Sequence, residues 1–211
     1  VYILSEAPIN NTFDHHWKMI LQENVKIIVI LVDLKPYKKT LKNKYWPDVD
    51  QSIDLLECYQ ITTLKEWEEY GIDHVNLIVT NKNDKSYTSI SIQYYNEWLD
   101  RDIPNDLDII IKLVDNIYMK RETKTTSPVL IHCSDGAGRS GTFVLIDMMI
   151  NKIRLEGWFT LISIKINLIL VRSLRPYLVD TLDQYKFIYT TIKHYIELKF
   201  KDLYFQSVYP D

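Results

Sequence analysis

The residues that organise this chain are Ile131-His132-Cys133-Ser134-Asp135-Gly136-Ala137-Gly138-Arg139-Ser140-Gly141, a run that holds three of its five glycines. An apolar segment from Pro128 to Ile131 precedes it and predicts a strand, and Thr142 to Ile153 follows and predicts a buried helix. Because glycine tolerates positive φ, the loop between them can turn its backbone N–H groups toward one point. With a helix N-terminus behind them, these amides form an anion-binding cradle.

Cys133 opens this loop and Arg139 closes it, so we expect a thiol at the floor of the cradle and a guanidinium across its rim. Donors that converge on one sulfur favour the thiolate, which is the nucleophilic form of cysteine. An arginine can bind two phosphoryl oxygens at once, which a lysine cannot. Ser140 stands next to Arg139, where its hydroxyl could donate a hydrogen bond to the sulfur. The alternative is a glycine-rich turn around a buried cysteine.

This run resembles the phosphate-binding loop of the cysteine-dependent, tyrosine-specific protein-tyrosine phosphatases. The resemblance implies that Ser134, Asp135, Gly136, Ala137, Gly138 and Arg139 bind the phosphate of a substrate. It implies an α/β fold, the phosphotyrosine protein phosphatase fold, in which helices flank a twisted mixed β-sheet. It also implies that residues 1–211 form a single domain.

The resemblance extends over nearly the whole chain, from Tyr2 to about Tyr195. The segments that carry it before the loop are Tyr2-Ile3, Ser5-Glu6-Ala7-Pro8, Trp17-Lys18-Met19 and Tyr45-Trp46-Pro47. Lys42-Asn43-Lys44-Tyr45 looks like the family's phosphotyrosine-recognition loop, but Trp46-Pro47 continues it and matches a later family element. We therefore expect the recognition loop and the N-terminal helices to be missing, so that the domain is N-terminally truncated.

Trp98-Leu99-Asp100 is the second candidate element, in a polar segment that ends at Pro104. It resembles the family's mobile acid loop, Trp-Pro-Asp, with Leu99 in place of proline and Asp100 as the proton donor. A positioned carboxylic acid is worth about 10² to 10⁴ in rate. The alternative is that Asp100 and Asp102 only solvate a loop.

Val179-Asp180-Thr181 followed by Gln184 is the third candidate element. Thr181 and Gln184 have the spacing of a helix capping box. In the resemblance this segment is the glutamine loop, which positions the water that hydrolyses the phosphocysteine. Gln184 matches its second glutamine, whereas Asp180 stands where the first glutamine would be. Both interpretations of Gln184 stay open.

The resemblance implies a protein-tyrosine phosphatase that works through a phosphocysteine intermediate on tyrosine-phosphorylated proteins and needs no cofactor. Three departures predict reduced activity: Leu99, Asp180, and Asp135 where many active relatives have alanine. The alternative function is a pseudophosphatase that binds phosphotyrosine proteins without turnover. A receptor tail, a free enzyme and a virus-encoded phosphatase, such as those of polydnaviruses, are all compatible with the sequence.

The rest of the chain supplies a conventional core. Val25 to Val32 is a continuous β-branched run and predicts a buried central strand. Thr12 is expected to cap a helix over Phe13 to Leu21. Further strands are predicted over Ser52–Thr63, which contains Cys58 as a core residue, His74–Thr80 and Ser86–Tyr95. Further helices are predicted after Asn105 or Asp106, over a largely buried Leu161–Leu174, and over Tyr185–Ile196, whose apolar and tyrosine side chains are expected in the core.

Composition limits the remaining classes of function. The chain has 211 residues, 46% of them hydrophobic, and a formal net charge of −3. This charge predicts no attraction to nucleic acid or to an anionic membrane. Two cysteines predict no disulfide framework and favour a reducing, intracellular (cytoplasmic) setting. The histidines lack metal-ligand spacing, so we expect no metal site, and we find no membrane-spanning or signal segment.

Overall fold

The computed structural model describes residues 1–32, 44–121, 127–157 and 159–208. In these residues one mixed sheet has the strand order β1-β7-β2-β6-β5-β4-β3. Its parallel half joins β1, β7, β2 and β6, and its antiparallel half continues through β5, β4 and β3. The strands are β1 (Tyr2–Glu6), β2 (Ile27–Ile30), β3 (Ser52–Leu55), β4 (Tyr59–Glu69), β5 (Ile72–Asn81), β6 (Tyr87–Tyr94) and β7 (Val129–Cys133).

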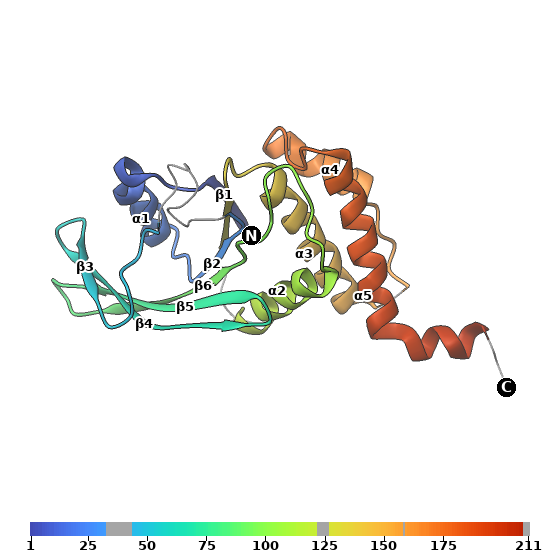
Figure 1. Ribbon diagram of the computed structural model, residues 1–211, viewed down its shortest axis with the longest axis horizontal. Helices are drawn as coiled ribbons and strands as arrows, with labels where there is room; N and C mark the ends of the chain where they lie inside the picture. Colours follow the sequence, from blue (N-terminus) through green and yellow to red (C-terminus); the bar gives the residue numbers. More distant parts are fainter. Residues whose placement is uncertain (33–43, 122–126, 158, 209–211) are drawn as a thin grey trace.

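Helices cover both faces of the sheet (Figure 1). They are the short 3₁₀ turn η1 (Asn10–Thr12), α1 (Phe13–Gln22), α2 (Leu107–Lys120), α3 (Gly138–Glu156), α4 (Ile164–Leu174) and α5 (Leu182–Val208). The helix α1 lies on one side, whereas α2, α3 and α5 gather on the other (Figure 1). This arrangement confirms the predicted α/β class with a mixed sheet.

The continuous apolar run of β2 reflects its position between these two helical layers. Ile27, Val29 and Leu31 belong to the core that contains α2 and α3. Ile28 and Ile30 belong to the opposite core, which contains α1. Because successive side chains of a strand point to opposite faces, a strand covered on both faces has no polar alternation.

The catalytic candidate strand β7 is hydrogen-bonded on both sides. It pairs in parallel with β1 and with β2. Just beyond these pairings, Ala7 N donates to the Cys133 carbonyl at 2.9 Å and Leu31 N donates to the His132 carbonyl at 2.9 Å. The backbone of Cys133 is therefore held from two neighbours where β7 ends.

Two predictions around Cys58 are wrong: that Ser52–Thr63 is one strand, and that Cys58 is a core residue. The predicted strand Ser52–Thr63 is in fact a hairpin, in which β3 and β4 are joined by a turn with positive φ at Leu56 and Glu57. Cys58 lies in this turn and is partly exposed, so it is not a core residue. Neither turn residue is a glycine, which explains why the turn carried no sequence signal.

Three helix predictions also need correction. The helix predicted from Leu161 begins at Ile164, and it is mostly exposed, because only Ile164 and Leu168 are buried. Thr12 precedes α1 but makes no side-chain cap; its hydroxyl bonds with Ile9 instead. Tyr189 of α5 is 46% exposed and is not part of the core.

Other local predictions are confirmed. Asp106 caps α2, because its carboxylate accepts from Asp108 N at 2.8 Å. Gly157 ends α3 with φ of +86°. No helix in the described part of the chain is long and apolar enough to cross a membrane.

Candidate active site

Cys133 stands at the end of β7, and the loop that follows leads directly into α3 at Gly138. The side chain of Cys133 is fully buried. Gly136 has φ of +70°, and a Cβ at this position would lie 2.2 Å from the Ser5 carbonyl oxygen. The glycine therefore lets the loop turn back against the end of β1. The predicted strand, loop and helix start are all present.

Asp135 folds its carboxylate into this loop. Its Oδ1 accepts a hydrogen bond from Cys133 Sγ at 3.3 Å and another from Ala137 N at 3.0 Å. Partial burial acts to raise the pKa of this carboxyl, but the bonds from Ala137 N and Cys133 and the charge of Arg139 hold the pKa below its ordinary value. Asp135 is thus an ionised group that occupies donors within the cradle.

Arg139 joins the phosphate loop to the acid loop. Its Nη1 donates to the Trp98 carbonyl at 2.8 Å, and its Nη2 donates to Asp100 Oδ1 at 2.9 Å. The guanidinium is only 4% exposed, whereas the Asp100 side chain is 70% exposed. Arg139 and Asp100, two predicted site residues that are 39 positions apart in the sequence, therefore contact each other.

Arg139 Nε and Ser140 Oγ are buried and have no hydrogen-bond partner among the described residues. Leaving a buried donor unpaired costs about 1–3 kcal/mol. Both atoms belong to the first turn of α3, where an anion would find further amide donors. The predicted bond from Ser140 to the Cys133 sulfur does not occur in this structure.

The glutamine loop packs directly on the phosphate loop. A Cβ at Gly138 would lie 3.2 Å from Asp180 Cβ and 3.3 Å from Gln184 Oε1, so the glycine permits this close approach. Gln184 N donates to Thr181 Oγ1 at 3.1 Å, and Gln184 Oε1 accepts from Thr181 N at 3.4 Å. The capping-box interpretation is confirmed.

Gln184 and Asp180 also reach the acid loop. Gln184 Nε2 donates to the Asp102 carbonyl at 3.4 Å. Arg101 Nε lies 3.3 Å from Asp180 Oδ2, in an ion pair. Trp98 Nε1 closes the acid loop on itself by donating to the same Asp102 carbonyl at 2.7 Å. The phosphate, acid and glutamine loops therefore form one connected cluster.

Arg175 is a site residue that sequence reasoning missed. Its Nε donates to the Gly136 carbonyl at 3.1 Å, and its Nη2 donates to the Asp135 carbonyl at 3.1 Å. These bonds give two carbonyls of the phosphate loop a cationic hydrogen-bond donor from outside the loop. The only signal in the sequence was an arginine placed before Pro176 at the start of the glutamine loop.

Tyr45 contacts β7 through His132, the residue before Cys133. Its hydroxyl is hydrogen-bonded to His132 Nε2 at 2.8 Å, and its ring is 2% exposed. Burial raises the pKa of the Tyr45 phenol, so it stays neutral. Tyr45 therefore positions His132, and its buried ring is not available to contact a ligand. Residues 42 and 43 of the Lys42-Asn43-Lys44-Tyr45 segment lie outside the described residues.

Comparison with known proteins agrees with this arrangement. The family model described as protein-tyrosine phosphatase matches residues 1–194. The chain is 30% identical over 203 residues to tyrosine-protein phosphatase corkscrew of Drosophila virilis, covering 93% of this chain and 26% of that protein. It is 29% identical over 201 residues to human receptor-type tyrosine-protein phosphatase alpha, covering 93% of this chain and 24% of that protein.

A shorter relative is similar to the chain over the same region. The rat non-receptor type 7 tyrosine-protein phosphatase is 26% identical over 195 residues, which cover 92% of this chain and 52% of the relative. The chain thus spans between about a quarter and a half of the length of these relatives. Because the family model matches nearly all of it, and the phosphate loop has the geometry described above, the chain belongs to the protein-tyrosine phosphatase family.

Proposed function

We propose that this chain hydrolyses phosphotyrosine in proteins through a phosphocysteine intermediate, and that Asp135 slows it. The observation that carries the proposal is the Arg139 guanidinium, which binds the acid loop while its buried Nε stays unpaired among the described residues. A phosphate dianion in the cradle supplies the missing acceptor. The family shown by comparison makes hydrolysis of a phosphoric monoester the expected chemistry.

The reaction proceeds in two displacements. In the first, the Cys133 thiolate attacks phosphorus, the bond from phosphorus to the tyrosine oxygen breaks, and Asp100 gives its proton to the leaving oxygen. In the second, water attacks phosphorus and gives a proton to Asp100, while the bond to sulfur breaks and inorganic phosphate leaves. Arg139, together with the amides of residues 134–138, stabilises the charge in both steps.

The remaining predicted roles belong to the same proposal. Substrate phosphate displaces Asp100 from Arg139, which frees the carboxyl to act as the acid. Ser140 Oγ, buried beside the loop, donates to the sulfur as the phosphoryl group leaves. Gln184 orients the attacking water in addition to its capping role. The reaction needs no cofactor, and residues 1–211 act as the one domain that carries these loops.

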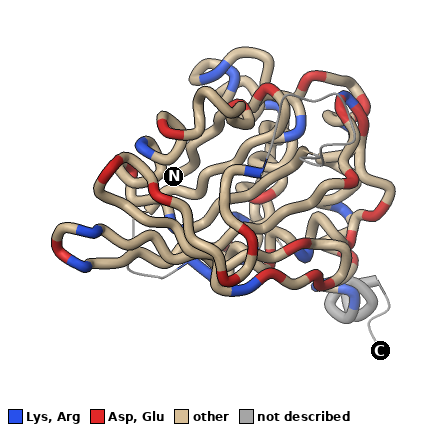
Figure 2. Tube along the Cα trace, turned by 60° about the vertical axis from the view of Figure 1, so that its left-hand side comes forward, with Lys and Arg blue, Asp and Glu red and all other residues tan. Residues whose placement is uncertain are grey.

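A second candidate function is a pseudophosphatase that binds tyrosine-phosphorylated proteins without turnover. Asp135 favours it, because its carboxylate takes a hydrogen bond from the nucleophile itself and another from a loop amide. A carboxylate beside the sulfur opposes formation of the thiolate. Under either function the partner is a tyrosine-phosphorylated protein in a reducing, cytoplasmic setting. Nucleic acid is not a proposed partner, since acidic and basic residues are interspersed along the trace (Figure 2).

The deciding experiment is hydrolysis of a phosphotyrosine peptide, measured as phosphate release by the wild-type chain and by Cys133→Ser. We expect turnover by the wild type and none by Cys133→Ser. Cys58→Ser is the matched control, because Cys58 lies in the turn between β3 and β4. Retained turnover in Cys133→Ser would disprove the nucleophile assignment. Binding of the peptide without turnover by the wild type would establish the pseudophosphatase.

A further inference from the structure

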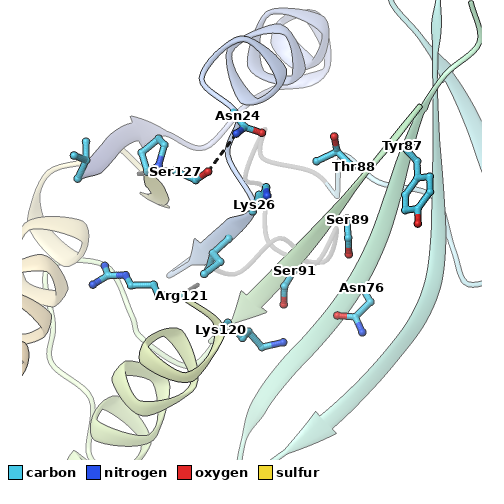
Figure 3. Close-up of a pocket in the computed structure, with 13 residues that line it drawn as sticks. Asn24, Lys26, Asn76, Tyr87, Thr88, Ser89, Ser91, Lys120, Arg121 and Ser127 are labelled. Atoms are coloured by element: carbon cyan, nitrogen blue, oxygen red, sulfur yellow. Dashed lines mark hydrogen bonds between the residues drawn. The ribbon is translucent and has the colours of Figure 1, made fainter. Parts of the chain in front are cut away.

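A cavity of about 710 Å³ opens where β2 begins and α2 ends (Figure 3). It is lined by residues at the start of β2 and just before β7, including Lys26 and Ser127, and by Lys120 where α2 ends. Cys133 stands at the other end of β7. At about 3.3 Å per residue, the five residues of this strand separate the two sites by about 16 Å. The cavity is therefore distinct from the phosphate loop.

The floor of this cavity is a polar strand face. In β6, Ile90 and Ile92 point into the core that contains α1, so the alternating Ser89 and Ser91 point to the α2 side. Asn76 of β5 pairs with Ser91 and shares its face. These three side chains line the cavity, and Lys120, where α2 ends, is the one helical residue among its described lining residues (Figure 3).

Three cations also line the cavity, with no carboxylate among its described lining residues. Arg121 already has a counter-charge, because its Nη2 lies 3.0 Å from Asp147 Oδ2. Its guanidinium also lies over the ring of Tyr2. Lys26 and Lys120 form no ion pair with the described residues. Burial lowers the pKa of Lys120, because its ammonium is partly removed from water. Bringing an anion into the cavity would relieve this cost.

We propose that this cavity binds a small phosphorylated polyol, with Lys26 and Lys120 on its phosphates and Ser89, Ser91 and Asn76 on its hydroxyls. A single inorganic anion would use the lysines but not the row of side chains that can each donate and accept. A purely apolar ligand would offer no acceptor to the ammonium groups of Lys26 and Lys120. The volume suits a ring that carries several phosphates. The proposal does not depend on catalysis at Cys133.

The test uses inositol 1,4,5-trisphosphate as the probe and isothermal titration calorimetry on the full chain. We expect wild-type binding that weakens as salt is raised, because exposed charges are screened. The Lys26→Gln/Lys120→Gln double variant should bind at least tenfold more weakly. The matched control is Lys18→Gln/Lys193→Gln, which removes two exposed lysines from α1 and α5 and should leave the affinity unchanged.

A third variant guards against loss of folding in the lysine double variant. Ser89→Asp places a carboxylate at an exposed position on the floor of the cavity and should also weaken binding at least tenfold. Absence of wild-type binding would overturn the proposal. So would a loss of binding in Arg139→Lys together with full binding in the Lys26→Gln/Lys120→Gln variant, since the probe would then occupy the phosphate loop.

The same chemistry has two sources, a free polyol phosphate and a lipid headgroup. Sedimentation with phosphatidylcholine vesicles that contain phosphatidylinositol 4,5-bisphosphate separates them. Sedimentation that the lysine double variant loses assigns the headgroup, and calorimetric binding without sedimentation assigns the free compound. Each result supports the site.

Discussion

The Asp135 carboxylate accepts hydrogen bonds that a phosphate oxygen would otherwise receive. It engages both the Cys133 thiol and the Ala137 amide, and its ordinary state near neutral pH is ionised. A substrate dianion must therefore displace or tolerate a charge of the same sign. At effective dielectric constants between those of water and a protein surface, such a charge costs about 0.5 to 2 kcal/mol per unit charge of the substrate, and so about 1 to 4 kcal/mol for a dianion.

Replacing this carboxylate should strengthen anion binding. We expect Asp135→Ala to lower the inhibition constant of orthovanadate by a few-fold to a few hundredfold, because two loop donors become free and a repulsion disappears. Asp135→Asn separates the two causes, since it keeps an acceptor but removes the charge. An inhibition constant that does not change in Asp135→Ala would show that the carboxylate turns away when an anion binds.

At the scale of elements, the loop between β7 and α3 depends on the close approach of β1. Gly136 and Gly157 both have positive φ, but only Gly136 has no room for a Cβ, because the Ser5 backbone occupies that space. An L-residue with such a positive φ costs roughly 1–3 kcal/mol at either position. Overpacking adds about 1–3 kcal/mol more where a Cβ collides.

The two glycines therefore form a matched pair. Gly157→Ala should lower the free energy of unfolding by about 1–3 kcal/mol, whereas Gly136→Ala should lower it by about 1–3 kcal/mol beyond that. Urea denaturation monitored by circular dichroism measures both. Equal losses would mean that the loop can move away from β1 at little cost.

The acid and glutamine loops are also coupled as elements. Arg101 pairs with Asp180, and Gln184 donates to the Asp102 carbonyl. If Asp180 orients the hydrolytic water poorly, the phosphocysteine accumulates. Rapid mixing with an aryl phosphate should then give a burst followed by a slow steady state, and Asp180→Gln should raise the steady-state rate. A linear wild-type trace from time zero would contradict this assignment, and Asp183→Asn is the control for a nearby charge.

At the scale of the whole molecule, the free energy of unfolding should depend on pH because of the buried His16, which packs against His132 of β7. His16 packs edge-on against Tyr45 and His132, and burial lowers its pKa from 6.5 to about 4. The unfolded chain therefore binds a proton between pH 6.5 and 4 that the folded chain excludes. Stability is complete above pH 6.5 and declines as the pH falls toward 4.

This shift corresponds to about 2 kcal/mol of unfolding free energy lost between pH 7.5 and pH 5. His16→Phe keeps a ring in the same space and removes the titration, so its stability should be flatter over this range. Urea denaturation at the two pH values measures the difference. The exposed His15 offers the control variant His15→Phe, and an equal slope in wild type and His16→Phe would refute the prediction.

Local patterns predicted much of this fold because their causes are local. The apolar run, the glycines and the following helix predicted β7, the phosphate loop and α3, and the all-apolar β2 predicted a strand covered on both faces. The prediction that α4 is largely buried is wrong, because apolar periodicity does not say what covers a helix. The exposed apolar residues of α4 are Ile166, Ile169, Leu170 and Leu174.

The candidate site was predicted less completely, because several of its contacts join distant segments. Arg175 holds carbonyls 39 and 40 positions away, and no spacing rule predicts that contact. The direction of the Asp135 side chain is likewise set by the rotation of one bond. A sequence pattern can name a residue in a loop, but it does not say which donors its side chain takes.

The pairing of β7 with a strand on each side limits how the reactivity of Cys133 can be lowered. Because β7 pairs with both β1 and β2, the backbone of Cys133 is held in place, so a change in reactivity falls to the side chains around the sulfur. A pivot of the Asp135 side chain suffices, and motions of this kind take picoseconds to nanoseconds when they are unhindered. An inactive and an active molecule would then have the same overall shape. A partner that recognises this shape would bind both of them.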